Sequence, residues 1–73
     1  MRVRIFLRQP FFTQPGYIPR AAVIVEGALE AEKEAGWVVS LDTWSDERGN
    51  KLESGVHRVF VPFAKIDHAL YVG

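Results

Sequence analysis

Apolar and polar residues alternate along four stretches of this chain, and a period of two is typical of half-buried strands. These stretches are residues 2–8, 37–44, 56–62 and 66–72. In the first, Val3, Ile5 and Leu7 share one face, while three arginines and Phe6 occupy the other. The pattern predicts strands that enclose a thin apolar core.

Residues 20–35 fit two patterns. As a helix, they place Ala21, Ile24 and Ala28 in one stripe, and their second half is composed of strong helix formers. As a strand, they begin with a β-branched run and bend at Gly27. We favour the bent strand. The helix alternative would make the fold α+β.

The alternation after residue 56 breaks at Pro62 and resumes at Ile66. Proline cannot donate to a strand ladder, so it ends one strand there. A tight 3₁₀ turn near residues 62–65 would move the chain from one edge of the sheet to the other, with Phe63 or Ile66 filling the corner. The predicted fold class is therefore all-β, a small five-stranded SH3-like barrel with a 3₁₀ turn before its last strand.

Two loops separate the predicted strands. Residues 9–19 contain three prolines, so we expect no regular structure there. Phe11, Phe12 and Tyr17 make this loop unusually apolar, and it is either a flap that seals one end of the core or a loop that binds a protein partner. Residues 45–55 are polar and rich in glycine, and we expect a solvated loop.

The composition indicates one small domain over residues 1–73, without cysteines and therefore without disulfides or thiolate chemistry. Nine basic and nine acidic residues cancel, whereas strong non-specific binding to nucleic acid usually needs a basic surplus. Arginines interrupt the N-terminal apolar run, so no signal peptide or membrane span is expected. A cytoplasmic protein with no membrane partner is the default expectation.

Residues with catalytic or metal-binding potential are few. His57 and His68 are the only histidines, and their spacing fits no compact metal site. No serine stands in a context that suggests a nucleophile, and no glycine-rich phosphate loop is present. We expect no enzymatic activity, no catalytic residue, no metal and no cofactor.

Four segments together resemble the Sm-like family, particularly its bacterial RNA chaperones of the Hfq type. They are VRIFL at residues 3–7, VEGALE at residues 25–30 with Gly27 at its bend, WVVSL at residues 37–41 and IDHALYV at residues 66–72. That family has a V-x-I-[YF]-L first strand, a second strand that bends at a glycine, and a final aromatic-Lys-His-Ala-Ile segment. The resemblance implies a five-stranded barrel that forms homo-oligomers and binds single-stranded RNA.

The resemblance also implies RNA contacts at His68 and at Trp37, which stands near the family's base-stacking aromatic. The residues themselves add Arg4 and Arg8, because the arginine face of residues 2–8 can follow a phosphate backbone while Phe6 stacks on a base. Lys65 is a further candidate contact. Asp67 stands where the family has an RNA-contacting lysine, and a carboxylate repels phosphate. The residues alone suggest a competing interpretation, in which the arginines of residues 2–8 pair with the glutamates of residues 26–32 on the neighbouring strand.

The outer face of the predicted sheet keeps an apolar set that a small monomer should not expose. The set is Phe6, Ile24, Val38, Phe60 and Tyr71. We therefore predict self-association through edge strands, with Phe6, Phe60 and Tyr71 at the interface. A non-enzymatic, self-associating barrel that binds single-stranded RNA is the first functional hypothesis. The alternative is a protein-interaction or assembly module that uses the aromatic loop of residues 9–19.

Overall fold

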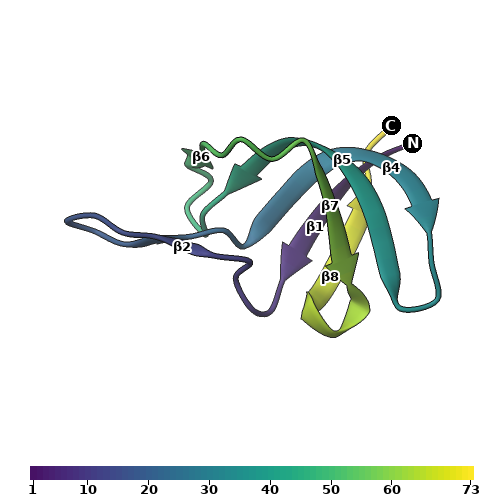
Figure 1. Ribbon diagram of the computed structural model, residues 1–73, viewed down its shortest axis with the longest axis horizontal. Coiled ribbons are helices and arrows are strands. Elements are labelled where there is room, and N and C mark those ends of the chain that lie inside the picture. The colour runs from purple at the N-terminus through teal and green to yellow at the C-terminus, as the bar shows by residue number, and fades with distance from the viewer.

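A computed structural model describes all residues 1–73, and it contains strands and one 3₁₀ turn but no α-helix (Figure 1). The five longer strands are β1 (Arg2–Leu7), β4 (Ile24–Glu32), β5 (Gly36–Ser45), β7 (Arg58–Pro62) and β8 (Ile66–Tyr71). Three two-residue strands are β2 (Thr13–Gln14), β3 (Arg20–Ala21) and β6 (Lys51–Leu52). The all-β prediction is confirmed. Because there is no α-helix, none is long and apolar enough to cross a membrane.

All pairings are antiparallel, and the main sheet has the order β6-β5-β4-β1-β8, with β7 also paired to β5. The five longer strands therefore follow the order β7-β5-β4-β1-β8, so the 3₁₀ turn carries the chain from one edge of the sheet to the other, as expected. The sheet curls so that β7 and β8 lie near each other (Figure 1), but no hydrogen-bonded pairing joins them.

The helix alternative for residues 20–35 is wrong, because β4 runs as one bent strand between β1 and β5. Its register with β5 shifts between Glu26 and Gly27, so the glycine marks the bend as expected. A β-carbon at Gly27 would lie 2.1 Å from the backbone oxygen of Ser40, and only glycine permits this approach.

The predicted corner before the last strand is also confirmed. Pro62 ends β7 with φ −64° and ψ 140°, a 3₁₀ turn follows over Phe63–Lys65, and β8 begins at Ile66. Of the two residues expected to fill the corner, Ile66 packs against the core, whereas Phe63 is 44% exposed.

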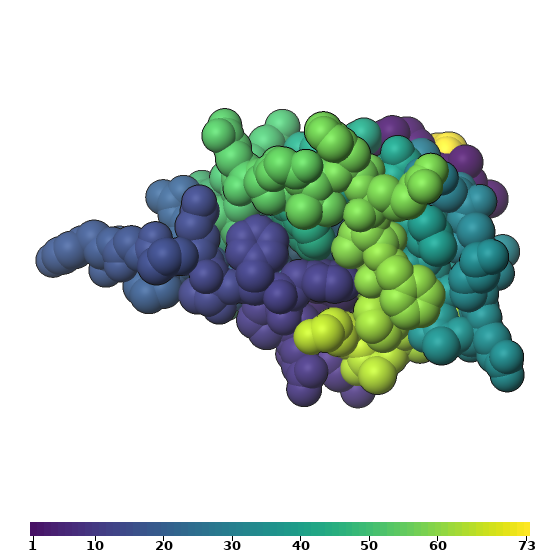
Figure 2. Space-filling view, in the orientation of Figure 1, coloured from purple at the N-terminus to yellow at the C-terminus, as the bar shows by residue number.

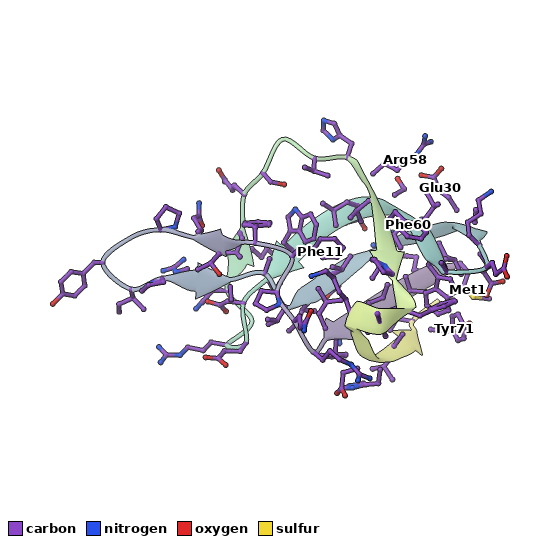
Figure 3. All side chains as sticks on the ribbon, turned by 60° about the horizontal axis from the view of Figure 1, so that its bottom comes forward. Met1, Phe11, Glu30, Arg58, Phe60 and Tyr71 are labelled. Atoms are coloured by element: carbon purple, nitrogen blue, oxygen red, sulfur yellow. The ribbon has the colours of Figure 1, made fainter.

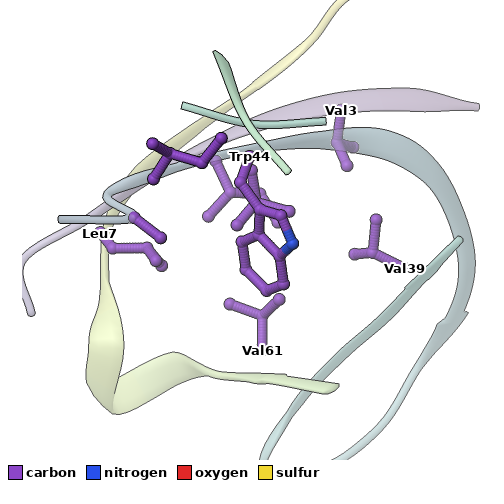
Figure 4. Packing of buried hydrophobic residues seen from close by; sticks show 9 residues of the cluster. Val3, Leu7, Val39, Trp44 and Val61 are labelled. Carbon is purple, nitrogen blue, oxygen red and sulfur yellow. The ribbon is translucent and has the colours of Figure 1, made fainter. Parts of the chain in front are cut away.

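Nine buried apolar residues form the core, which lies inside the curled sheet (Figure 4). They are Val3, Ile5, Leu7, Ala22, Val25, Val39, Trp44, Leu52 and Val61. Leu52 corrects the expectation of a fully solvated loop at residues 45–55, because β6 pairs with the end of β5 and turns this side chain inward. A single apolar residue in a polar stretch gives no periodic signal.

Residues 13–21 form an arm that projects from the body of the protein (Figures 1 and 2). The arm consists of β2, β3 and the turn between them. The expectation of irregular structure is wrong here, because Thr13 pairs with Ala21 and Gln14 with Arg20. The three prolines lie outside both strands, so they leave these pairings intact. The arm lengthens the molecule to 37 Å, against 21 and 20 Å in the other directions.

Candidate interaction surfaces

The outer edge of β7 carries unpaired backbone groups. On the edge of β7 that faces β5, the N–H of Leu41 donates to the carbonyl of His57. This bond shows which residues of β7 exchange hydrogen bonds with β5. Bonded and non-bonded pairs alternate in an antiparallel ladder, so the odd-numbered residues of β7 bond to β5. The N–H and C=O groups of Arg58 and Phe60 therefore point to the free edge.

The outer edge of β8 is free in the same way. The N–H of Val72 donates to the carbonyl of Arg2, so the even-numbered residues of this strand bond to β1. The N–H and C=O groups of Ala69 and Tyr71 therefore point away from β1. The two longer edge strands of the main sheet, β7 and β8, thus each have a free edge, and they lie on either side of the 3₁₀ turn.

Exposed apolar side chains are concentrated on these two strands and on the turn between them. Of the nine large hydrophobic residues that are exposed, five belong to the segment that starts at β7, which is green to yellow in Figure 2. These five are Phe60, Phe63, Leu70, Tyr71 and Val72. An apolar surface beside a free edge favours the addition of another strand.

Three aromatic rings gather on the inner side of β8, and we call them the aromatic patch: Trp37, Phe63 and Tyr71. The Trp37 ring centroid lies 6.1 Å from that of Phe63 and 6.0 Å from that of Tyr71. These distances are within the range of favourable aromatic contacts. Phe63 and Tyr71 remain 44% and 59% exposed, so the patch is a surface and not part of the core.

The position of Tyr71 corrects the predicted outer apolar face. Tyr71 pairs with the buried Val3, and residues paired across strands point to the same side, so its ring lies on the inner face. The cause is a bulge at Asp67, where the register between β8 and β1 shifts by one residue. After this extra residue, the side chains that a regular alternation from Ile66 would place outside lie on the inner face. Phe60 remains on the outer face, opposite Val38.

Phe6 and His68 form a second ring pair on the outer side of β8. Their centroids are 4.4 Å apart and their planes differ by 13°, so the rings are stacked. Nδ1 of His68 lies 2.9 Å from Oδ2 of Asp67. The guanidinium of Arg8 donates to the carbonyl oxygen of Ile66 at 3.0 and 3.2 Å and has no carboxylate partner.

The predicted pairing of arginines with acids is present, with partly different partners. Nε of Arg4 is 2.9 Å from Oε1 of Glu26, the residue that faces it in β4. Arg2 pairs with Asp42. Glu30, also expected to pair with an arginine of residues 2–8, pairs with Arg58 of β7 (Figure 3). Two of the three arginines of residues 2–8 are thus neutralised within the chain.

The five residues proposed for RNA contacts do not form one site. Arg4, Arg8 and His68 lie on the outer side of β1 and β8. Trp37 lies on the inner side, since it pairs with the buried Val61. The ammonium group of Lys65 is 5.7 Å from the ring centroid of Phe11, at the base of the arm.

The aromatic loop of residues 9–19 divides into two parts. The rings of Phe11 and Phe12 both lie 5.3 Å from the buried Trp44 ring, so they cover one end of the core as the flap interpretation predicted. Tyr17 is fully exposed at the tip of the arm, and Ile18 beside it is 63% exposed. Only the tip is therefore accessible to a partner.

Asp46 is a buried acid whose carboxylate organises the turn before β6. Oδ1 accepts the backbone N–H groups of Arg48 and Asn50 at 3.0 and 2.8 Å, and Oδ2 accepts the side-chain amide of Asn50 at 3.2 Å. Burial acts to raise the pKa of Asp46, but these hydrogen bonds and the nearby charge of Arg20 outweigh it, so the pKa lies below its ordinary value.

No group of three or more histidine, cysteine, aspartate or glutamate side chains is placed to hold a metal ion. Sequence reasoning missed Phe63, Leu70 and Val72 as exposed edge residues, although the free edge that follows a 3₁₀ corner could have indicated them. No protein-family model matches this chain, and no curated protein or solved structure matches it either.

Proposed function

We propose that this protein is a non-enzymatic assembly subunit that self-associates by pairing the free edge of β7 in one copy with the free edge of β8 in the next. The carrying observation is that both edges present unpaired backbone groups at Phe60 and Tyr71, beside five of the nine exposed large hydrophobic residues. Along each edge, every second residue points its N–H and C=O groups outward, and the spacing is the same on both edges. The β7 edge of one copy and the β8 edge of another can therefore form a hydrogen-bonded ladder.

The two edges differ, which determines the kind of assembly. Pairing β7 with β8 is head-to-tail, so every added copy leaves one β7 and one β8 edge free at the ends. Such contacts close into a ring or continue as a filament. Burying an aromatic side chain contributes roughly 1.5–3 kcal/mol, which helps to offset the entropy lost on association.

Tyr71 allows the backbone contribution to be separated from that of the side chain. Tyr71→Ala removes the ring and keeps the edge N–H, whereas Tyr71→Pro removes both, and proline is tolerated where an N–H faces away from its own sheet. We expect the wild type to be oligomeric by light scattering or native mass spectrometry, with a larger loss of mass for Tyr71→Pro than for Tyr71→Ala.

Phe60 provides an independent test on the other strand. Phe60→Glu should dissociate the oligomer, because it places a charge in the apolar contact, and Phe60→Tyr should keep the wild-type mass. Circular dichroism confirms that each variant is folded. A wild type that is monomeric at tens of micromolar, or variants that all keep its mass, would overturn the proposal.

Single-stranded RNA binding and a cytoplasmic location stay predictions of the sequence. RNA binding is supported by the exposed His68 ring stacked on Phe6 and by the guanidinium of Arg8, which has no carboxylate partner. It is weakened by the Arg4–Glu26 pair and by the separation of Trp37 from the other proposed contacts. Edge pairing therefore has the stronger support from geometry.

A further inference from the structure

The arm is a paired hairpin, but the large side chains at its tip are exposed and do not pack on their own chain. Tyr17 is fully exposed and Ile18 is 63% exposed, although both carry large apolar side chains. The hairpin extends a ladder that also holds the N–H of Phe11 to the carbonyl of Ala22. A projecting apolar tip is the form of a segment that inserts into a complementary surface.

The aromatic patch is a group of three aromatic rings, two of which are exposed. Its members are close enough to offer one continuous apolar surface, with Phe63 and Tyr71 about half exposed. Figure 3 shows Tyr71 at the end of the molecule opposite to the arm, so a chain cannot cover its own patch with its own tip. The occupant must come from another molecule.

Charge complementarity indicates a second copy as that occupant. The arm carries one charged residue, Arg20, which belongs to no ion pair and lies near enough to Asp46 to lower its pKa. The patch borders the β4–β5 turn, where Glu32 faces Trp37 across the ladder and Glu34 is exposed, with Lys33 between them. The arm is thus positive and the rim of the patch is negative.

We infer that the tip of the arm docks on the aromatic patch of a neighbouring copy, with Tyr17 and Ile18 against Phe63 and Tyr71 and with Arg20 toward the acidic turn. This inference rests on the proposed self-association, and it adds a second contact, at Phe63, that borders the paired edge at Tyr71. The contact is also head-to-tail, so it reinforces the same kind of assembly.

The absence of cysteines allows the contact to be trapped directly. Tyr17→Cys chains are mixed with Phe63→Cys chains of different length, and the disulfide-linked pair is measured over time under mild oxidation. The matched control replaces Phe63→Cys by Val56→Cys, since Phe63 and Val56 are 44% and 43% exposed. We expect the Tyr17–Phe63 pair to form several-fold faster than the Tyr17–Val56 pair.

The same experiment in chains that also carry Phe60→Glu separates the two contacts. Persistence of the faster cross-link in these chains would show that the arm contact does not require edge pairing. If the cross-linking rates of the two pairs are equal in otherwise wild-type chains, the inference is overturned, even where Phe60→Glu alone dissociates the oligomer. Arg20→Glu, added to the Tyr17→Cys chains, tests the charge complementarity. Loss of the faster cross-linking would support it, and an unchanged rate would exclude it.

Discussion

Gly27 approaches the backbone of Ser40 so closely that the added β-carbon of an alanine would lie 2.1 Å from the Ser40 carbonyl oxygen. The obstacle is backbone within a paired ladder and cannot rotate away. We expect Gly27→Ala to destabilise the fold strongly, by more than the roughly 1 kcal/mol that ordinary glycine-to-alanine changes involve.

Chemical denaturation of Gly27→Ala beside Gly55→Ala would check this prediction. An added β-carbon at Gly55 meets no atom within 4 Å, and its φ lies outside the left-handed region. The control should therefore keep the wild-type midpoint. Equal midpoints for the two variants would show that the bend in β4 tolerates a side chain.

The flap role of Phe11 and Phe12 predicts a loss of stability rather than a loss of binding. Replacing either ring with serine removes a contact with the buried Trp44 and opens one end of the core. We expect each change to lower the free energy of unfolding by roughly 1–3 kcal/mol. Tyr17→Ser is the control in the same loop, and thermal melting should separate it clearly from the other two variants.

The pKa of Asp46 predicts a specific pH dependence of stability. Because its folded-state pKa lies below the ordinary value, the stabilisation from its ionised carboxylate is present above about pH 4 and is lost as the pH falls through the folded-state pKa. Asp46→Asn should therefore be less stable than the wild type near neutral pH, and the difference should shrink in acid. A difference in unfolding midpoint that stays constant between pH 7 and about pH 3 would contradict this account.

Binding of short oligo-U and oligo-A would test the RNA prediction. With zero net charge and two of the three arginines of residues 2–8 already paired with acids, any binding should be weak and should fall steeply with added salt. His68→Ala and Arg8→Ala should each reduce it in a gel-shift titration, whereas Trp37→Phe should not. No shift at micromolar protein in low salt would remove RNA as a ligand.

Local alternation was sufficient to predict the strands that border the core, because their inward residues recur every second position. It also supported a bent strand at Gly27 over a helix. The face of Tyr71 could not be predicted, because the bulge at Asp67 depends on the partner strand β1. The pairing within the arm likewise depends on partners that are not neighbours in sequence, such as Thr13 and Ala21.

Among the candidate interaction residues, the sequence indicated Phe60 and Tyr71 through their excess of apolar surface. It could not show that they lie on opposite faces of the sheet, or that both have backbone groups at free edges. The aromatic patch was equally hidden, since Trp37, Phe63 and Tyr71 belong to three different elements and meet only after the sheet curls.

The chain has two tryptophans, and the fold places them in contrasting surroundings. Trp44 is 3% exposed, and its indole N–H donates to the hydroxyl of Ser54 at 2.6 Å. Trp37 is only partly buried and stands in the aromatic patch. The intrinsic fluorescence of this protein therefore combines two reporters: emission from Trp44 follows unfolding, and emission from Trp37 follows whatever covers the patch. Replacing one indole at a time with phenylalanine would let the same spectrometer follow folding and assembly separately.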